Sequence, residues 1–124
     1  MKILIADDSA LIRKQLRLLL SEIEGAVVET AVDGMEATWL IGQFAPDIII
    51  LDIEMPHMNG IEVLRQIRKD DQSSTVIMFT AAPSPENREI CFRVGANFFL
   101  DKRSEADSML EICRREALLR RGGE

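Results

Sequence analysis

The chain has 124 residues, 47% of them hydrophobic and 29% charged, which is the balance of a folded globular protein and not of a disordered one. This length suits a single domain with one real core, so we expect one domain over residues 1–124. The net charge of -6 argues against binding to a nucleic-acid backbone, and no apolar run approaches the ~20 residues that a membrane span needs.

The first part of the chain alternates apolar runs with amphipathic segments. Residues 2–6 predict a strand, and the apolar residues that recur at helical spacing after it predict a helix. Residues 27–32 alternate only loosely and carry polar side chains, as an edge strand does. Asp33 and Glu36 resemble a capping box for a second helix, which we expect to end before Pro46.

The run from Ile48 to Leu51 is apolar throughout and lies between two acids, Asp47 and Asp52. Four apolar residues are too few for a typical helix and predict a strand buried on both faces, as in a parallel sheet covered by helices. Ligands of such sheets bind beyond the carboxyl ends of the strands. Asp52 is therefore a candidate reactive group, although alone it is equally well explained as a solvated acid that opens a loop.

The rest of the chain repeats this alternation. Asn59 and Ser84 are expected to cap a third and a fourth helix, the latter with Pro85 in its first turn and Gly95 at its end. Residues 76–79 predict another doubly buried strand between these helices.

A fifth strand at residues 97–100 and a last helix from about residue 104 to 121 complete the chain. Five strand–helix units with right-handed crossovers produce a parallel sheet with helices on both faces. Every strand then presents its carboxyl end to the same edge of the sheet. The polar residues at these ends are Asp7, Asp8, Asp52, Thr80 and Lys102.

These side chains together suit phosphoryl chemistry. Three carboxylates that lie close together repel, and a proton, a cationic side chain or a metal relieves the repulsion. Because the expected ligands are oxygens without nearby histidine or cysteine, Mg²⁺ or Mn²⁺ is the natural metal. Each residue alone has an ordinary explanation as a helix cap, a strand-end hydroxyl or a surface cation. A metal and a lysine, however, can hold a phosphoryl group while a carboxylate attacks the phosphorus.

Over essentially its whole length, the chain resembles the receiver domain of two-component response regulators. The matching motifs are Asp7-Asp8-Ser9, Asp52 with Met55-Pro56 and Met58-Asn59-Gly60, Thr80-Ala81, Gly95-Ala96 and Lys102. They occur in the order of the family and with similar spacing. The resemblance implies a flavodoxin-like (βα)5 sandwich with a five-stranded parallel sheet of order 2-1-3-4-5.

The resemblance also implies a role for each site residue. Asp52 would accept a phosphoryl group from a phosphohistidine of a histidine kinase or histidine phosphotransfer protein, or from a small acyl phosphate. Asp8, Asp52 and the backbone carbonyl of Glu54 would ligate Mg²⁺ or Mn²⁺, and Asp7 would act largely through water. Lys102 would pair with the phosphoryl oxygens.

Two residues would switch the domain in this reading. Thr80 would move its hydroxyl onto the phosphoryl group, where the small Ala81 leaves access and offers its N–H. Phe99 matches the aromatic switch position and would turn inward as Thr80 moves. The result would be a two-state surface formed by the fourth helix, the fifth strand and the fifth helix, which controls an output partner or domain or a homodimer.

Two positions set this chain apart from the family pattern or vary within it. The lysine is commonly followed by a cis proline, whereas Arg103 follows Lys102 here. A non-proline cis bond costs about 3–4 kcal/mol, so we expect either a trans bond with a reshaped loop or a strained bond. Glu54 adds negative charge at the mouth of the site, which would discourage an attacking hydroxide and lengthen the phosphoryl lifetime.

Three other functions fit the sequence less well. In Mg²⁺-dependent aspartyl-phosphate hydrolases, the nucleophilic strand is followed by a motif that resembles Asp-x-Asp-x-Thr, whereas this chain has Asp52-Ile53-Glu54-Met55-Pro56. Such hydrolases also usually carry an inserted cap, for which 124 residues leave no room. A flavin or nucleotide carrier needs a phosphate cradle after the first strand, where Asp7 and Asp8 would repel phosphate. A non-phosphorylated interaction module is disfavoured because all five site residues are present.

The remaining features favour a cytoplasmic location. Met1 leads directly into a strand, with no room for a signal peptide. Cys91 and Cys113 lie in expected helices without metal-binding spacing and are interpreted as reduced core residues. His57, the only histidine, is expected to be a solvated loop residue.

Overall fold

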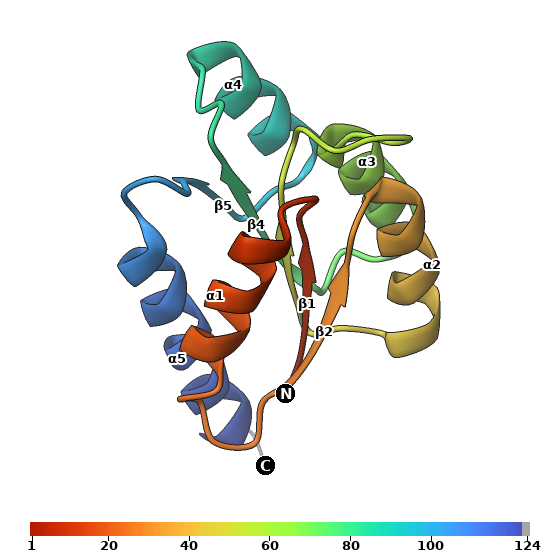
Figure 1. The fold of residues 1–124 in the computed structure, drawn as a ribbon. Helices are drawn as coiled ribbons and strands as arrows, with labels where there is room; N and C mark the ends of the chain where they lie inside the picture. Colours follow the sequence, from red (N-terminus) through yellow and green to blue (C-terminus); the bar gives the residue numbers. More distant parts are fainter. Residues whose placement is uncertain (123–124) are drawn as a thin grey trace.

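A computed structural model of the chain describes residues 1–122, with side chains through Arg120, and contains five strands and five helices in alternation (Figure 1). The strands are β1 (Lys2–Ala6), β2 (Val27–Ala31), β3 (Ile48–Leu51), β4 (Thr75–Thr80) and β5 (Phe98–Asp101). The helices are α1 (Ala10–Leu20), α2 (Gly34–Phe44), α3 (Gly60–Asp70), α4 (Pro85–Val94) and α5 (Ala106–Gly122). The domain end expected at residue 124 lies outside the described residues.

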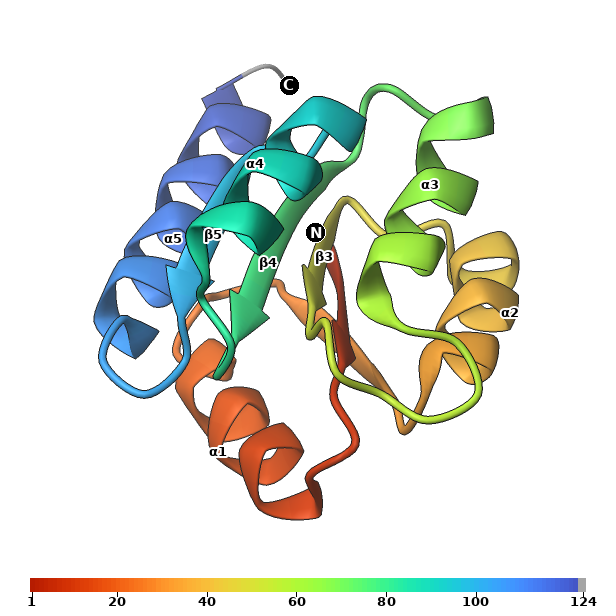
Figure 2. The ribbon, with the colours of Figure 1, turned by 90° about the horizontal axis from the view of Figure 1, so that it is seen from above.

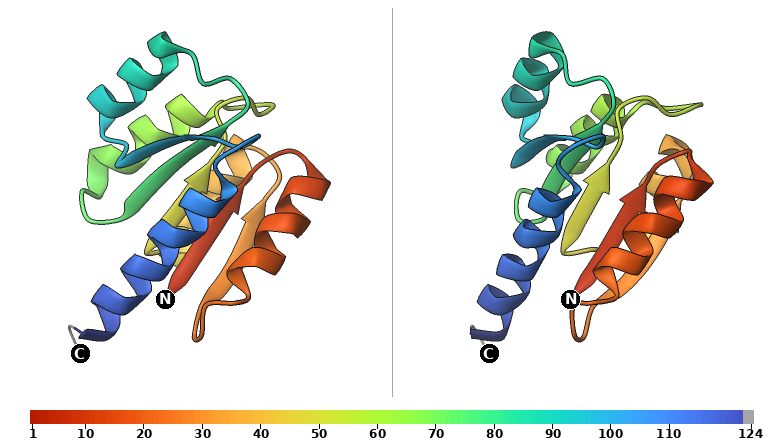
Figure 3. Two further views of the ribbon diagram at one scale, coloured as in Figure 1. Left: turned by 90° about the vertical axis from the view of Figure 1, so that its left-hand side faces the viewer. Right: turned by 60° about the vertical axis from the view of Figure 1, so that its left-hand side comes forward.

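The five strands form one parallel sheet in the order β2-β1-β3-β4-β5, which confirms the expected fold class. The polar second strand is indeed at an edge. Helices α1 and α5 cover one face of the sheet, and α2, α3 and α4 cover the other (Figures 1 and 2). The start of β1 and the end of α5 lie opposite the carboxyl edge of the sheet (Figure 3).

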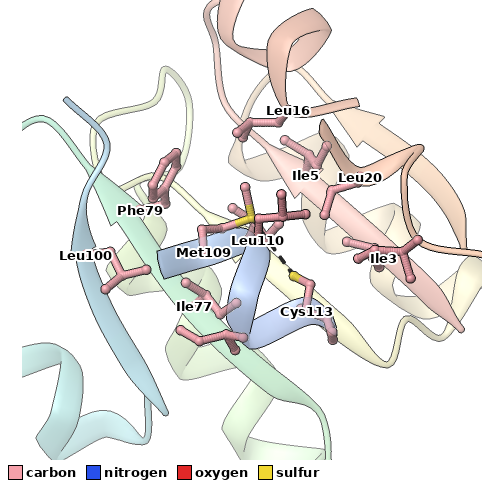
Figure 4. Packing of buried hydrophobic residues seen from close by; sticks show 14 of the residues in the cluster. Ile3, Ile5, Leu16, Leu20, Ile77, Phe79, Leu100, Met109, Leu110 and Cys113 are labelled. Atoms are coloured by element: carbon pink, nitrogen blue, oxygen red, sulfur yellow. Dashed lines mark hydrogen bonds between the residues drawn. The ribbon is translucent and has the colours of Figure 1, made fainter. Parts of the chain in front are cut away.

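The continuous apolar runs of the central strands are explained by two cores. Successive side chains of a strand point to opposite faces, so a strand covered on both faces must be apolar at every position. The core under α1 and α5 includes Ile3, Ile5, Leu16, Leu20, Ile77, Phe79 and Met109 (Figure 4). The core under the other helices includes Leu4, Ile49, Leu51, Leu64, Val76, Met78 and Cys91. Each fully buried Leu or Ile contributes about 1.5–3 kcal/mol relative to an exposed one.

The helices begin at the polar residues that the sequence indicates. The side-chain oxygens of Asp33, Asn59 and Ser84 accept a hydrogen bond from the backbone N–H three residues later, at 2.8, 3.0 and 3.1 Å. Ser9 caps α1 in the same way. Gly95 ends α4 with a φ of 125°, a conformation that favours glycine. None of the helices within residues 1–122 is both long enough and apolar enough to cross a membrane.

Helix α5 begins at Ala106, two residues later than expected. The backbone N–H groups of Ser104 and Glu105 both donate to the carbonyl of Asp101, at 3.2 and 2.8 Å, and so close a turn before the helix. Arg103 lies in this turn and follows Lys102 through a trans peptide bond, since residues 1–122 contain no cis bond. Of the two expected alternatives for this bond, the trans bond is therefore the one observed.

Candidate functional site

The expected site residues meet at the carboxyl edge of the sheet. The strand register places Ala6 beside Leu51 and Thr80 beside Asp101. Positions at or just after these strand ends are therefore neighbours in space. The candidate residues at these positions are Asp7, Asp8, Asp52, Thr80 and Lys102.

Lys102 joins two of the carboxylates. Its ammonium nitrogen Nζ donates to Asp7 Oδ2 at 3.0 Å and to Asp52 Oδ2 at 2.9 Å. The side chains of Lys102, Asp7 and Asp52 are only 14%, 3% and 4% exposed, respectively. A charge this buried is tolerated only when it is paired, so each member of the cluster depends on the others. The backbone N–H of Lys102 donates to the carbonyl of Thr80 at 3.0 Å, which holds the lysine beside β4.

The three carboxylates form a cluster that fits a hard cation. One oxygen each of Asp7, Asp8 and Asp52 lies within 4.8 Å of the others. Asp7 and Asp52 are buried and Asp8 is exposed, so the cluster opens to solvent at Asp8. Mg²⁺ prefers oxygen ligands and keeps several waters, which a cluster open on one side allows.

Burial and neighbouring charges shift the pKa values of Asp52 and Lys102. Burial raises the pKa of Asp52, and the charge of Asp7 adds to this, although the hydrogen bond from Lys102 opposes it. Burial acts to lower the pKa of Lys102, but its hydrogen bonds to Asp52 and Asp7 prevail and the pKa is raised. Asp7 and Asp52 thus share one ammonium in a buried site, and a divalent cation would relieve their mutual repulsion.

Thr80 is fully buried and its hydroxyl is already engaged. Its Oγ1 accepts a hydrogen bond from the backbone N–H of Ala82 at 3.0 Å. The carbonyl of Ala82 in turn accepts from Asn87 Nδ2, in the first turn of α4, at 3.1 Å. A chain of two hydrogen bonds therefore connects the Thr80 hydroxyl to α4.

Phe99 is 6% exposed and so lies inward. Its ring centroid is 6.4 Å from that of Phe92, and the guanidinium of Arg88 lies 5.9 Å from it. Glu54 is exposed, in the loop that follows Asp52. The structure thus places the Phe99 ring against Phe92 of α4 and Glu54 at the surface, two residues after Asp52.

The loop after Asp52 packs closely against neighbouring backbone at two glycines, a feature that the sequence did not indicate. A Cβ atom added to Gly60 would lie 1.9 Å from the carbonyl oxygen of Asp52, and one added to Gly34 would lie 1.8 Å from the carbonyl oxygen of Met58. Both glycines therefore allow backbone to approach backbone. Gly60 belongs to the matching motif, but this reason for it is visible only in three dimensions.

His57 is exposed, as expected, but it is not simply solvated. Its Nδ1 lies 2.9 Å from Asp33 Oδ2. The hydrogen bonds from the Glu36 N–H and from His57 hold the pKa of Asp33 below its usual range. The pair ties the loop after Asp52 to the start of α2. No sequence signal indicated this contact, because the partners are 24 positions apart.

Comparison with known proteins agrees with this geometry. The sequence profile of the response regulator receiver domain matches residues 3–114. Response regulator MprA of Mycobacterium avium is 38% identical over 121 residues, which are 98% of this chain and 52% of MprA. The chain thus spans about half the length of the curated relatives that it matches.

Two solved structures show the same fold. A CheY-like receiver domain protein from Methanospirillum hungatei has a TM-score of 0.88 at 27% identity, covering 99% of this chain and 98% of that one. A chain of the CheX–CheY–BeF3–Mg²⁺ complex from Borrelia burgdorferi has a TM-score of 0.84 at 33% identity, covering 96% and 89%.

The chain belongs to the response regulator receiver domain family of two-component systems. It is therefore a signalling domain rather than a conventional enzyme.

Proposed function

We propose that this domain accepts a phosphoryl group on Asp52 from a phosphohistidine of a histidine kinase or histidine phosphotransfer protein. The observation that carries the proposal is the position of Asp52. It is a buried carboxylate at the carboxyl end of a central strand, 2.9 Å from the ammonium of Lys102 and beside Asp7 and Asp8. We also propose that residues 1–124 form a single receiver domain.

Asp8, Asp52 and the backbone carbonyl of Glu54 would hold Mg²⁺ or Mn²⁺, and Asp7 would act through water. The all-oxygen cluster, open at Asp8, supports this assignment. So does the likeness to the CheX–CheY complex from Borrelia burgdorferi, which contains BeF3 and Mg²⁺. When bound, the cation would neutralise the carboxylates and the phosphoryl oxygens.

The transfer itself is a substitution at phosphorus. A carboxylate oxygen of Asp52 forms a bond to phosphorus while the bond from phosphorus to the histidine nitrogen breaks, and the electron pair leaves with the imidazole. Lys102 is protonated throughout because its pKa is raised, and its ammonium can pair with a phosphoryl oxygen. A water that attacks the acyl phosphate would later return Asp52 to its free form.

Thr80 and Phe99 would couple this chemistry to the surface. If the Thr80 hydroxyl moves toward a phosphoryl oxygen, its hydrogen bond from the N–H of Ala82 would weaken, and Ala82 is the residue that Asn87 of α4 contacts. Phe99 is already buried, and we expect Arg88 and Phe92 to move with it, since both lie against its ring. The altered face of α4, β5 and α5 would control an output domain, an output partner or a homodimer.

The experiment that tests the proposal is direct phosphorylation. The domain is incubated with Mg²⁺ and acetyl phosphate, and its mass is measured intact. We expect the mass of one added phosphoryl group, its absence in Asp52→Asn, and its loss when the metal is removed by a chelator. Absent labelling of the wild type, or labelling that persists in Asp52→Asn, would overturn the assignment. Turnover of an external phosphomonoester would favour the aspartyl-phosphate hydrolase instead.

A further inference from the structure

A basic groove lies between α3 and α4, which are neighbours on one face of the sheet (Figure 2). Its volume is about 660 Å³. Each helix contributes three residues at positions i, i+3 and i+4, so three side chains of each helix share the face toward the groove. The lining residues are Arg65, Arg68 and Lys69 of α3 and Ile90, Arg93 and Val94 of α4.

The charge of this groove is opposite to that of the molecule. The chain carries a net charge of -6, yet four of its 15 basic residues line the groove and no acidic residue does. Arg65 and Lys69 are exposed, and neither makes a hydrogen bond or an ion pair to any part of the chain that the structure describes. Their charges are therefore available to a partner. Arg93 pairs only with Glu89 of its own helix, at the surface.

Arg68 makes the groove a rigid feature. Its guanidinium donates to the carbonyls of Gly95, Asp71 and Ser74, at 2.9, 3.0 and 2.8 Å. It also donates to the side chain of Asn97 at 2.9 Å. These bonds tie the end of α3 to the turn after α4, so the two walls of the groove keep their relative positions.

Helix-dipole effects do not account for the whole groove. Cations in the last turn of a helix interact favourably with the helix dipole, and this effect alone can explain why Arg68, Lys69 and Arg93 are basic. Arg65 lies in the middle of α3, however. Ile90 and Val94 add a partly exposed apolar floor one helical turn long. The combination of an apolar floor and free cations has the character of a binding surface.

We propose that this groove docks an acidic amphipathic segment of a partner protein. Carboxylates of the segment would pair with Arg65 and Lys69, and an apolar side chain at helical spacing between them would rest on Ile90 and Val94. A nucleic acid fits less well, because its phosphate backbone would extend past the groove over a chain whose net charge is -6. The proposal does not depend on phosphorylation of Asp52.

The test uses a designed peptide and the unphosphorylated domain. The probe is a fluorescein-labelled helical peptide of about 15 residues, a length at which helices begin to be stable alone, with glutamates flanking a row of leucines. The double variant Arg65→Glu/Lys69→Glu should weaken its binding at least about tenfold. The matched control Lys14→Glu/Arg115→Glu reverses two exposed cations outside the groove and should change binding less than about twofold.

A charge exchange completes the experiment. A peptide with lysines in place of the glutamates should bind Arg65→Glu/Lys69→Glu more tightly than the wild type. Equal binding of the acidic peptide to the wild type and to this variant would overturn the proposal, as would equal weakening by the control variant. Preferential binding of a single-stranded oligonucleotide to the groove would also overturn it, in favour of nucleic acid.

Discussion

At the scale of residues, the main feature is a largely buried ammonium that bonds to two buried carboxylates, with a third carboxylate beside them. Lys102 reaches Asp7 and Asp52 at hydrogen-bond distance, and Asp8 completes the cluster from the solvent side. The raised pKa of Asp52 shows that one lysine does not compensate for the burial of this carboxylate. An acidic cluster that is under-compensated in this way favours a cation, and under the proposed function the cation would in turn hold the negative oxygens of a phosphoryl group.

The charge of Glu54 should set how long a phosphoryl group stays on Asp52. We expect Glu54→Ala to speed its loss severalfold, because an exposed carboxylate near the site repels an attacking hydroxide. The measurement is the decay of the phosphorylated form after the donor is removed. Glu54→Gln is the matched control, since it keeps the size of the side chain and removes the charge, and it should behave like Glu54→Ala. An unchanged or slower decay in Glu54→Ala contradicts the prediction.

Asp71 should make folding stability depend on acid pH. Burial opposes its ionisation, but hydrogen bonds from Ser73 and Ser74 lower its pKa to about 2 from the ordinary 3.8. A pKa that is lower in the folded than in the unfolded state stabilises the fold above pH 3.8, and the stabilisation disappears as the pH falls through 2.

Asp71→Asn removes this charge and keeps an oxygen acceptor. Because Asp71 is partly exposed, solvent screens its charge, and we expect Asp71→Asn to lower the free energy of unfolding by less than about 1 kcal/mol near neutral pH. The difference from the wild type should shrink between pH 4 and pH 2, as urea denaturation at a series of pH values can show. A difference that is constant over this range would assign the effect to something other than the ionised carboxylate.

At the scale of elements, caps and glycines decide where helices begin and how closely the loops pack. Asp33, Asn59 and Ser84 each satisfy a backbone N–H at a helix start, so these boundaries follow from local chemistry. Gly60 has a different role. It lets the first residue of α3 approach the backbone of Asp52, and it therefore places the loop that the proposed metal site uses.

Two glycine substitutions should have opposite effects on stability. Gly60→Ala would put a Cβ 1.9 Å from the carbonyl oxygen of Asp52, and since backbone cannot yield easily we expect a loss of about 1–3 kcal/mol or more. Gly42 lies within α2 with no atom within 4 Å of an added Cβ, so Gly42→Ala should gain about 0.5–1 kcal/mol. Urea denaturation measures both. Similar stability of the two variants would contradict the close approach at Gly60.

At the scale of the whole molecule, one sheet separates two cores. Cys113 belongs to the core under α1 and α5, and Cys91 belongs to the core under α2, α3 and α4. Both thiols are free and completely buried. Burial raises the pKa of Cys91 to about 11 and that of Cys113 to about 12, so neither is a reactive thiolate near neutral pH.

These two thiols report on the opening of the two faces separately. If the domain unfolds as one cooperative unit, a thiol reagent should label Cys91 and Cys113 at the same rate in the native state, through global unfolding alone. The rates are measured by mass spectrometry in the single variants Cys91→Ala and Cys113→Ala. Faster labelling of Cys91 would instead show that the α4 face opens on its own, without the rest of the domain.

The sequence by itself determined the elements, the buried character of the central strands and the candidate residues Asp7, Asp8, Asp52, Thr80 and Lys102. Apolar spacing, caps and strand-end polar residues are local signals, and they are legible along the chain because neighbouring residues produce them. The strand order came from the family resemblance, since the residues alone indicated only that the second strand is at an edge. Element ends were less accurate: the first helix, expected to stop near Gly25, ends at Leu20, and α5 begins two residues late because a local turn closes on the carbonyl of Asp101.

Only the tertiary structure decided the contacts between distant segments. Lys102 bonds to carboxylates 95 and 50 positions away, at Asp7 and Asp52. His57 pairs with Asp33 over 24 positions, and Arg65 faces α4 across a groove that neither helix forms alone. Such pairings depend on how five strand–helix units pack, and no local pattern encodes them, because the energy that creates them is gained only when both partners are in place.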